Sequence, residues 1–201
     1  VLKGAVQDSR IRVTAVCSRT REAAEAFVQR NPMACGARIY TSVEDMAADP
    51  EVDAIYIGTP NQTHCAYTLT CLNAGKHVLC EKPIAPTYEE AEEFCRTVKE
   101  SNIRVLIAHI LRHNTLYQKA GEMIRNGVIG DVRLIRMAQN HHILDRPRYM
   151  NLLSSCSPIV DCGVHYIDVI RWMTGLEVMD WKGQGAIIDP TIPENTFDYG
   201  M

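Results

Sequence analysis

Hydrophobic residues along this chain of 201 residues follow two alternating patterns. Short runs rich in β-branched residues predict strands at 12–17, 39–40, 54–57, 77–80 and 104–108. Runs with helical spacing predict helices at 21–30, 43–48, 62–74, 88–101 and 116–126. Strands joined by crossover helices run parallel, so the alternation predicts an α/β fold with a doubly wound parallel sheet.

Polar residues and glycines mark where these helices begin and end. Thr20 is the expected N-cap of the helix at 21–30, and Ser42 followed by Asp45 resembles a capping box. Three helices are expected to end at glycines, which are Gly75, Gly127 and Gly175. The strand at 54–57 is nearly all apolar, so we expect it to be buried on both faces of the sheet.

The pattern changes near Gly130. The remaining elements are expected to be a longer alternating strand at 132–140, an irregular polar segment at 141–157, a helix at 158–174 and a second strand at 185–188. We therefore expect a Rossmann-type nucleotide-binding domain at 1–130. The beginning of an α+β domain with an open sheet is expected at 131–201.

Both predicted domains look incomplete. Residues 1–6 resemble the end of a helix, and no G-x-G-x-x-G turn occurs in the chain, so we expect the first strand and its glycine-rich turn to precede Val1. Two strands and one helix do not cover a sheet face in the second domain. The chain is therefore expected to be a fragment of a longer product.

Composition excludes several classes of protein. Hydrophobic residues make up 46% and charged residues 22%, as in folded globular chains. The net charge of −3 comes with no basic stripe, which argues against a nucleic-acid partner. No apolar run is long enough to span a bilayer, and no secretory signal is present, so we expect no membrane association.

The chain contains eight cysteines and no C-x-x-C pair. Several of them, such as Cys17, Cys80 and Cys95, fall within apolar strand or helix patterns. We expect buried, reduced thiols and hence a cytoplasmic location.

Three polar segments follow predicted strands, where parallel sheets bind ligands. In the first, at 58–64, Thr59 and Asn61 offer polar side chains while Gly58 and Pro60 shape the turn. The following helix offers free N–H groups to an anionic or sugar ligand. An ordinary strand-to-helix turn capped by Asn61 explains the same residues.

The second segment is Glu81-Lys82-Pro83. Lys82 can offer a proton donor at the edge of the sheet while Glu81 orients it, and Pro83 rigidifies the turn, conceivably through a cis bond. A surface ion pair is the alternative.

The third segment, Cys17-Ser18-Arg19, concerns the cofactor. Dinucleotide-binding sheets carry an acidic residue here for the adenosine ribose, whereas an arginine suits a 2′-phosphate. Ser18 and Arg19 therefore favour NADP slightly over NAD. A solvated Arg19 that stacks on adenine would give the same sequence.

The helix at 158–174 carries a further constellation. Asp161, His165 and Asp168 fall on one helical face, and Gly163 between them indicates a close approach. A histidine one turn from a carboxylate can accept a proton. A core histidine bonded to Asp161 is one alternative. A metal site of Asp161, His165 and either His141 or His142 is another, but no metal-binding spacing supports it, so we expect no metal.

Taken together, these motifs resemble the Gfo/Idh/MocA oxidoreductases. The resemblance rests on A-V-C-S-R at 15–19, D-A-I-Y-I-G-T-P-N-Q-T-H at 53–64, G-K-H-V-L-C-E-K-P at 75–83 and D-C-G-V-H-Y-I-D at 161–168. It implies an NAD(P)-dependent enzyme that moves a hydride between the nicotinamide and a carbinol carbon of a sugar, inositol or related polyol. It also implies a homo-oligomer formed through the C-terminal sheet.

The resemblance implies a role for each matching residue. Lys82 would bind the reacting hydroxyl, Asp161 would position the substrate, and His165 would be the general acid/base. Cofactor contacts would come from Ser18, Arg19, Thr59, Pro60, Asn61, His64, Glu81 and Lys82. For Arg112 the resemblance implies only a cofactor contact. The segment around it, H-I-L-R-H-N at 109–114, departs from the family pattern.

Two other functions stay open. Glycosidases of the same fold oxidise their substrate transiently with bound NAD. The second open function is that of a non-catalytic relative that binds a sugar or a cofactor. The lack of a glycine-rich turn favours this function, whereas the presence of Lys82, Asp161 and His165 argues against it.

Overall fold

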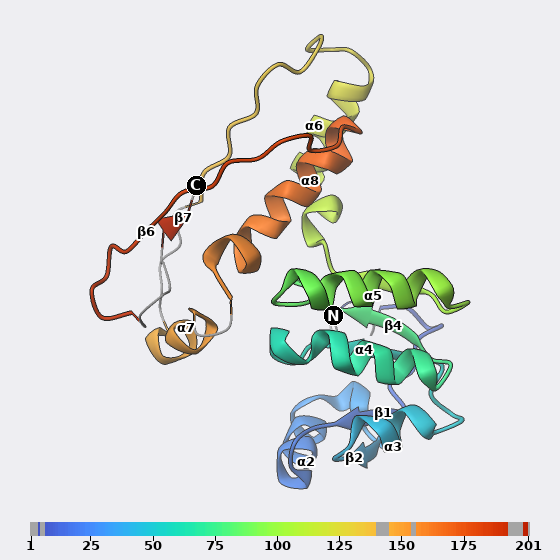
Figure 1. Cartoon of the computed structure of the whole chain (residues 1–201). Helices are drawn as coiled ribbons and strands as arrows, with labels where there is room; N and C mark the ends of the chain where they lie inside the picture. Colours follow the sequence, from blue (N-terminus) through green and yellow to red (C-terminus); the bar gives the residue numbers. More distant parts are fainter. Residues whose placement is uncertain (1–3, 5–6, 140–144, 154–155, 193–198, 201) are drawn as a thin grey trace. The chain divides into compact units, whose positions relative to one another are not determined.

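The structure of the chain, a computed structural model, describes residue 4 and residues 7–139, 145–153, 156–192 and 199–200. Its described residues form two compact units. The first unit lies within 1–59, 63–80 and 92–106, and the second within 60–62, 81–91 and 107–201. Figure 1 labels the α-helices and several strands of both.

Parallel strands form the centre of the first unit. The strands are β1 (Ala15–Cys17), β2 (Arg38–Tyr40), β3 (Ala54–Ile57), β4 (His77–Cys80) and β5 (Val105–Ile107). Strand β1 pairs with β2, and β3, β4 and β5 follow one another in a second group; the β1–β2 and β3–β4 pairs are parallel. This arrangement confirms the predicted Rossmann-type sheet.

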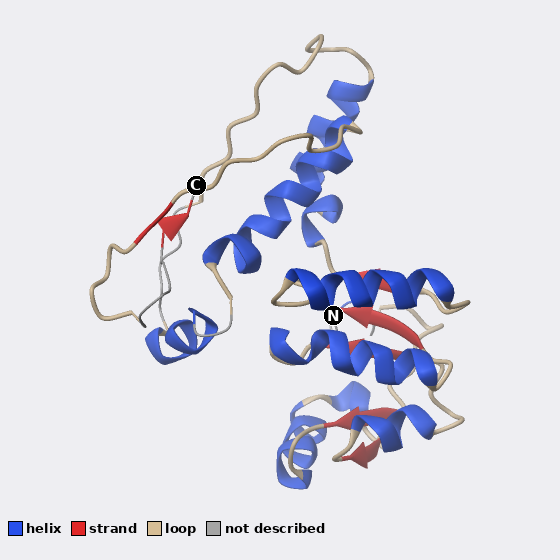
Figure 2. Ribbon diagram, in the orientation of Figure 1, coloured by secondary structure: helices blue, strands red, loops and turns tan. Residues whose placement is uncertain are grey.

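Helices connect these strands, as Figure 2 shows. They are α2 (Arg21–Arg30), α3 (Val43–Ala48), α4 (His64–Asn73) and α5 (Tyr88–Glu100), with short 3₁₀ turns η1 (Pro32–Ala34) and η2 (Asn61–Thr63). Helices α2 and α3 pack on β1 and β2, and α4 packs on β3 and β4. The bounds of α2 and α3 are those predicted.

The predicted helix ends are confirmed. The Thr20 hydroxyl accepts from the Ala23 N–H at 3.2 Å, and the Ser42 hydroxyl accepts from the Asp45 N–H at 3.1 Å. Each satisfies an N–H group that the first helical turn leaves unpaired. The three predicted helix stops adopt positive φ, which is 75° at Gly75, 69° at Gly127 and 70° at Gly175.

The expectation that β3 is buried on both faces was wrong. Ile55 and Ile57 are buried, whereas Ala54 and Tyr56 on the opposite face are exposed. Successive side chains of a strand point to opposite faces, so only one face of β3 is covered by described residues. Burial of each isoleucine stabilises the fold by roughly 2 kcal/mol.

All eight cysteines are described and free. Cys65, Cys71, Cys80 and Cys156 are buried, and burial raises the pKa of Cys71 to about 11. The prediction of burial was wrong for Cys95, which is exposed on α5, and Cys17 is half-buried.

The second unit is mainly helical among its described residues. Its elements are the 3₁₀ turn η3 (Ile110–His113), helices α6 (Thr115–Arg125), α7 (Arg146–Leu153) and α8 (Val164–Thr174), the π turn η4 (Ile159–Gly163) and strands β6 (Gly185–Ala186) and β7 (Tyr199–Gly200). Helices α6 and α8 pack side by side (Figure 1). Strands β6 and β7 pair antiparallel.

Two predictions for this unit were wrong. Residues 132–139 form no strand, because no described strand lies beside them to pair with their backbone, and Leu134 is 85% exposed. The segment predicted as irregular at 141–157 contains helix α7. Asp145 begins this helix by accepting from the Arg148 N–H at 3.0 Å, a capping signal that the sequence analysis missed.

Three further expectations concern the two ends of the chain and membrane association. The predicted strand at 185–188 is shorter, since only Gly185–Ala186 pairs. The helix end expected at 1–6 lies outside the described residues except for Gly4. Within the described ranges, no helix combines the length and apolar character needed to cross a membrane.

Candidate functional site

Lys82 lies just beyond the end of β4, in a turn that contains a cis Lys82–Pro83 peptide bond. Its ammonium group donates to the main-chain carbonyl of Asp161 at 2.8 Å and to the carboxylate Oδ1 of Asp161 at 3.0 Å. Both side chains belong to the second unit and are about one fifth exposed. The pair is therefore shielded from bulk water yet reachable by a small molecule.

The partner of Lys82 differs from the one expected. Glu81 was expected to orient the lysine, but Asp161 holds it with two oxygens. An ammonium group has three protons, so these two bonds fix the direction of the third. A substrate hydroxyl oxygen that accepts this third proton would meet a positive charge in a defined place.

The segment that carries Asp161 is a π turn rather than the start of a regular helix. The N–H of Val164 reaches back five residues to the carbonyl of Ile159. Such turns occur often at functional sites. A Cβ added at Gly163 would lie 3.2 Å from Cγ2 of Ile159, so the expected close approach at this glycine is made by a neighbouring side chain.

His165 follows in the first turn of α8 and is half-buried. Burial lowers the pKa of its imidazole, the charges of Lys82 and His109 lower it further, and Asp161 and Glu81 act in the opposite direction. Its Nδ1 atom is buried and has no hydrogen-bond partner among the described residues. The lowered pKa favours the neutral ring near pH 7.

An ion pair lies one turn further along α8. Asp168 is buried, and both of its carboxylate oxygens accept from Arg112, at 2.8 Å from Nε and 2.5 Å from Nη2. The same carboxylate lies 3.7 Å from Nε2 of His109. The sequence analysis placed Asp168 on this helical face but did not find its partner. Arg112, expected as a cofactor contact, has its guanidinium group against Asp168.

The turn that follows β3 is held by local bonds in the first unit. His64 is 1% exposed, and its Nε2 donates to the carbonyl of Thr59 at 2.8 Å. The hydroxyls of Thr59 and Thr63 lie 2.7 Å apart. Thr59 and the neighbouring Pro60 are exposed, whereas the ring of His64 is enclosed by protein.

Asn61 belongs to the second unit, where its side-chain amide donates to Sγ of Cys156 at 3.0 Å. The alternative that Asn61 caps the next helix was wrong. The N-cap of α4 is Thr63, with no side-chain capping bond.

Ser18 and Arg19 follow β1 in the first unit. The N–H of Ser18 donates to the carbonyl of Tyr40 at 3.1 Å, while the Arg19 side chain is exposed. The local bond fixes the backbone and leaves the guanidinium group to solvent or a ligand.

The metal alternative involved His141 or His142, which lie outside the described residues. In the part of the chain that the structure describes, no three His, Cys, Asp or Glu side chains are grouped to hold a metal ion.

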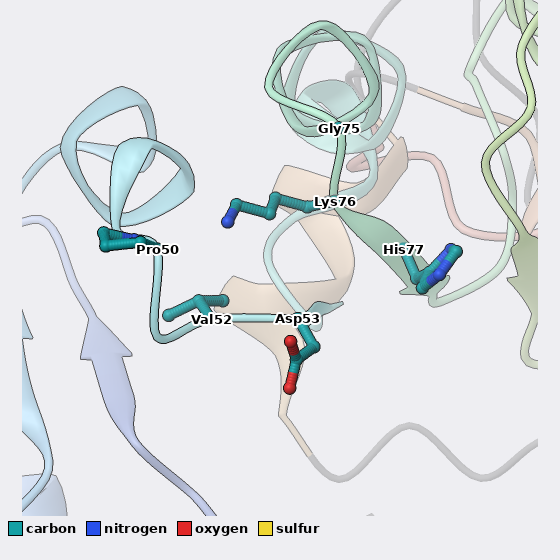
Figure 3. A pocket seen from close by; sticks show the side chains of 6 residues that line it. All are labelled: Pro50, Val52, Asp53, Gly75, Lys76 and His77. Atoms are coloured by element: carbon teal, nitrogen blue, oxygen red, sulfur yellow. The ribbon is translucent and has the colours of Figure 1, made fainter.

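A small open hollow lies at the other end of the first unit's strands. Figure 3 shows its lining by Pro50, Val52, Asp53, Gly75, Lys76 and His77. These residues precede or begin β3 and β4, and Lys76 donates to the carbonyl of Asp49 at 2.8 Å. Ligands of parallel sheets bind at the carboxyl ends of strands, so we do not assign this hollow to the candidate site.

Comparison with protein families matches almost the whole chain. Residues 3–109 match the oxidoreductase family with an NAD-binding Rossmann fold, and residues 117–201 match the GFO/IDH/MocA C-terminal domain. The chain belongs to the Gfo/Idh/MocA oxidoreductase family. The resemblance inferred from the sequence motifs is thereby confirmed.

Named Gfo/Idh/MocA relatives act on sugars and diols. The chain is 31% identical over 178 residues to a 1,5-anhydro-D-fructose reductase of Ensifer adhaerens, covering 85% of this chain and 51% of that protein. It is 29% identical over 158 residues to a trans-1,2-dihydrobenzene-1,2-diol dehydrogenase of Xenopus tropicalis, covering 79% of this chain and 47% of the relative.

A solved Gfo/Idh/MocA structure extends the comparison. The scyllo-inositol dehydrogenase of Lactobacillus casei, with bound NAD(H) and scyllo-inositol, is 26% identical with a TM-score of 0.78. The match covers 94% of this chain and 55% of that one. The chain thus spans about half the length of the relatives it matches.

Proposed function

We propose that the protein is an NAD(P)-dependent oxidoreductase that transfers a hydride between the nicotinamide and a carbinol carbon of a sugar, inositol or related polyol. One observation carries the proposal: the ammonium group of Lys82, held by Asp161, lies in the same unit as a half-buried imidazole, His165, whose pKa its charge lowers. The names of the relatives support the substrate class.

In the oxidation direction the residues would act as follows. The substrate hydroxyl oxygen accepts a hydrogen bond from the remaining N–H of Lys82, which stays protonated, and its positive charge stabilises the alkoxide as it forms. His165, neutral near pH 7, takes the hydroxyl proton at a ring nitrogen. When bound, a nicotinamide would accept the hydride, which leaves the carbinol carbon as the C–H hydrogen with the bonding electron pair. In the reduction direction, protonated His165 returns the proton.

Asp161 receives a second role beside the positioning of the substrate. Its two oxygens hold Lys82, so we propose that it positions the lysine as well as the substrate. The buried Nδ1 atom of His165, which lacks a partner among the described residues, supports a site built for a ligand or a bridging water.

For the cofactor we propose a slight preference for NADP. The exposed guanidinium group of Arg19 and the hydroxyl of Ser18 fit a 2′-phosphate, which an acidic residue would repel. Thr59, Pro60, Asn61, Glu81 and Arg112 are further proposed cofactor contacts. We propose that His64 acts by holding the carbonyl of Thr59, because its ring is buried.

The proposed setting is a cytoplasmic homo-oligomer with a cofactor domain at 1–130 and a substrate domain from 131 onward. Eight free thiols support a reducing compartment. Exposed apolar side chains in the second unit, such as Met179 and Trp181, support an association surface.

The test is a cofactor-reduction screen with the whole protein. NAD⁺ or NADP⁺ is supplied with inositols, sugars and glycosides, and both nicotinamide absorbance and products are followed. Net cofactor reduction with a ketone product is expected. Cleavage of a glycoside without net reduction would indicate the glycosidase chemistry instead, and binding without turnover would indicate a non-catalytic relative.

A further inference from the structure

We propose that Asp168 is a positioning residue for His165, acting through Arg112 and His109 by holding the η3 turn against helix α8. This inference rests on the proposed function for its catalytic consequence. Its structural part concerns only residues of the second unit and can be tested without any turnover.

The geometry around Asp168 is that of a strong, oriented contact. Arg112 donates to both carboxylate oxygens through Nε and Nη2, the paired arrangement that fixes two planar groups relative to one another. The Asp168 side chain is 8% exposed and that of Arg112 is 42% exposed, so water screens the carboxylate end of the pair little. Since Arg112 lies in η3 and Asp168 in α8, the pair joins these two elements.

The same carboxylate also reaches a histidine. His109 immediately precedes η3, and its Nε2 lies 3.7 Å from Oδ1 of Asp168. Its Nδ1 is buried without a hydrogen-bond partner among the described residues, as is Nδ1 of His165. Burial, the charge of Lys82 and the charge of His109 lower the pKa of His165, so His109 lies within electrostatic reach of that ring.

Through these contacts Asp168 can affect the position of His165, the proposed base, in two ways. Asp168 lies three residues after His165, on the same face of α8. The contact that holds Asp168 therefore also fixes how α8 is turned about its axis, and with it the position of His165. It also fixes where the ring of His109 stands in relation to that face. Among the described residues no hydrogen bond or ion pair joins Asp168 to Lys82, so we infer that its effect on the site passes through the histidines.

The chain offers a matched control on the same helix. Arg171 of α8 donates to both carboxylate oxygens of Glu177 at 2.7 and 2.9 Å, and this pair is exposed. Glu177, unlike Arg171, is not among the groups that shift the pKa of His109 or His165. Loss of such a surface pair has little effect on a protein. Comparing the two pairs distinguishes the effect of losing any arginine–carboxylate pair on α8 from the effect of losing the pair at Asp168.

The test uses Asp168→Asn, Arg112→Gln, the double variant and the control Glu177→Gln. The imidazole resonances of His109 and His165 are titrated by NMR after assignment with His109→Gln and His165→Gln. Burial lowers the pKa of His109, the charge of Asp168 acts in the opposite direction, and the charge of Arg112 lowers the pKa further. The titration midpoint of His109 is therefore expected to fall in Asp168→Asn and to rise in Arg112→Gln. The resonances of His165 are expected to change in both variants. Neither change is expected in Glu177→Gln.

Turnover is measured in the same variants of the whole protein. Each single variant is expected to lower kcat about 10- to 100-fold, as for a misplaced catalytic group, and cofactor binding is expected to be unchanged in Asp168→Asn. The double variant should lose no more than the worse single one, because both residues act through one contact. If Asp168→Asn does not fold, Arg112→Gln tests the same contact from its more exposed side.

Two failures are distinguishable. Histidine titrations and kcat that match those of Glu177→Gln in both single variants would overturn the positioning role. A wild-type protein that oxidises no polyol, while the histidine midpoints still move in opposite directions, would overturn the proposed function and leave the contact established.

Discussion

The ammonium group of Lys82 donates to two oxygens of one residue, Asp161, which lies 79 residues further along the chain. One of these oxygens belongs to the backbone of a π turn and the other to the side chain. A lysine bound in this way has a fixed orientation and keeps a single proton for a ligand. The histidine that follows on α8 lies under the influence of the same charge.

The direction of the pKa shift of His165 predicts the pH dependence of the reaction. Burial, Lys82 and His109 lower this pKa below its ordinary value of 6.5. Oxidation needs the neutral ring, so kcat/KM for oxidation should decrease as the pH falls through a midpoint below 6.5, whereas reduction should weaken as the pH rises through that midpoint. His109→Gln should move this midpoint upward, and His113→Gln, at an exposed histidine of η3, should leave it in place. A wild-type midpoint above 6.5 would contradict the assignment.

The exposed arginine after β1 predicts the cofactor preference. The whole protein should bind NADPH at least as tightly as NADH in a fluorescence titration. Arg19→Ala should weaken NADPH binding by about tenfold, since a charged hydrogen bond to the 2′-phosphate is lost, and should leave NADH binding nearly unchanged. Arg21→Ala, at a nearby exposed arginine, is the control. A strong preference of the wild type for NADH would refute this prediction.

The glycine after α8 predicts a local stability effect. Gly175 has a φ of 70°, a conformation that costs an alanine about 1–2 kcal/mol. Gly175→Ala should lower the free energy of unfolding by that amount in urea denaturation, and Gly175→Asn should lower it less, because asparagine tolerates this region. Equal stability of Gly175→Ala and the wild type would show that the helix does not need this stop.

Local signals in the sequence predicted much of the first unit. The bounds of α2 and α3 and the roles of Thr20 and Ser42 follow from short-range hydrogen bonding that the residues themselves specify. Helical spacing and the positions after strands also picked out Lys82, Asp161 and His165. These signals did not predict which side chain each of these residues contacts.

Contacts between distant segments explain the misses. The alternation at 132–139 is typical of a strand, but a strand forms only beside a partner, and none is described there. The pairing of Arg112 with Asp168 spans 56 residues, which spacing alone does not reveal. Helix α7 was missed for another reason, because its cap, Asp145, stands in a polar segment that resembles a loop.

The most direct test of the account is the effect of Lys82→Met on the whole protein. With Lys119→Met, at an exposed lysine of α6, as the matched control, turnover of the best polyol and the dissociation constant of the cofactor are measured in each variant. We expect Lys82→Met to lower turnover by about a hundredfold or more while cofactor still binds, because the developing alkoxide loses its cation. Turnover equal to that of Lys119→Met would contradict the central claim.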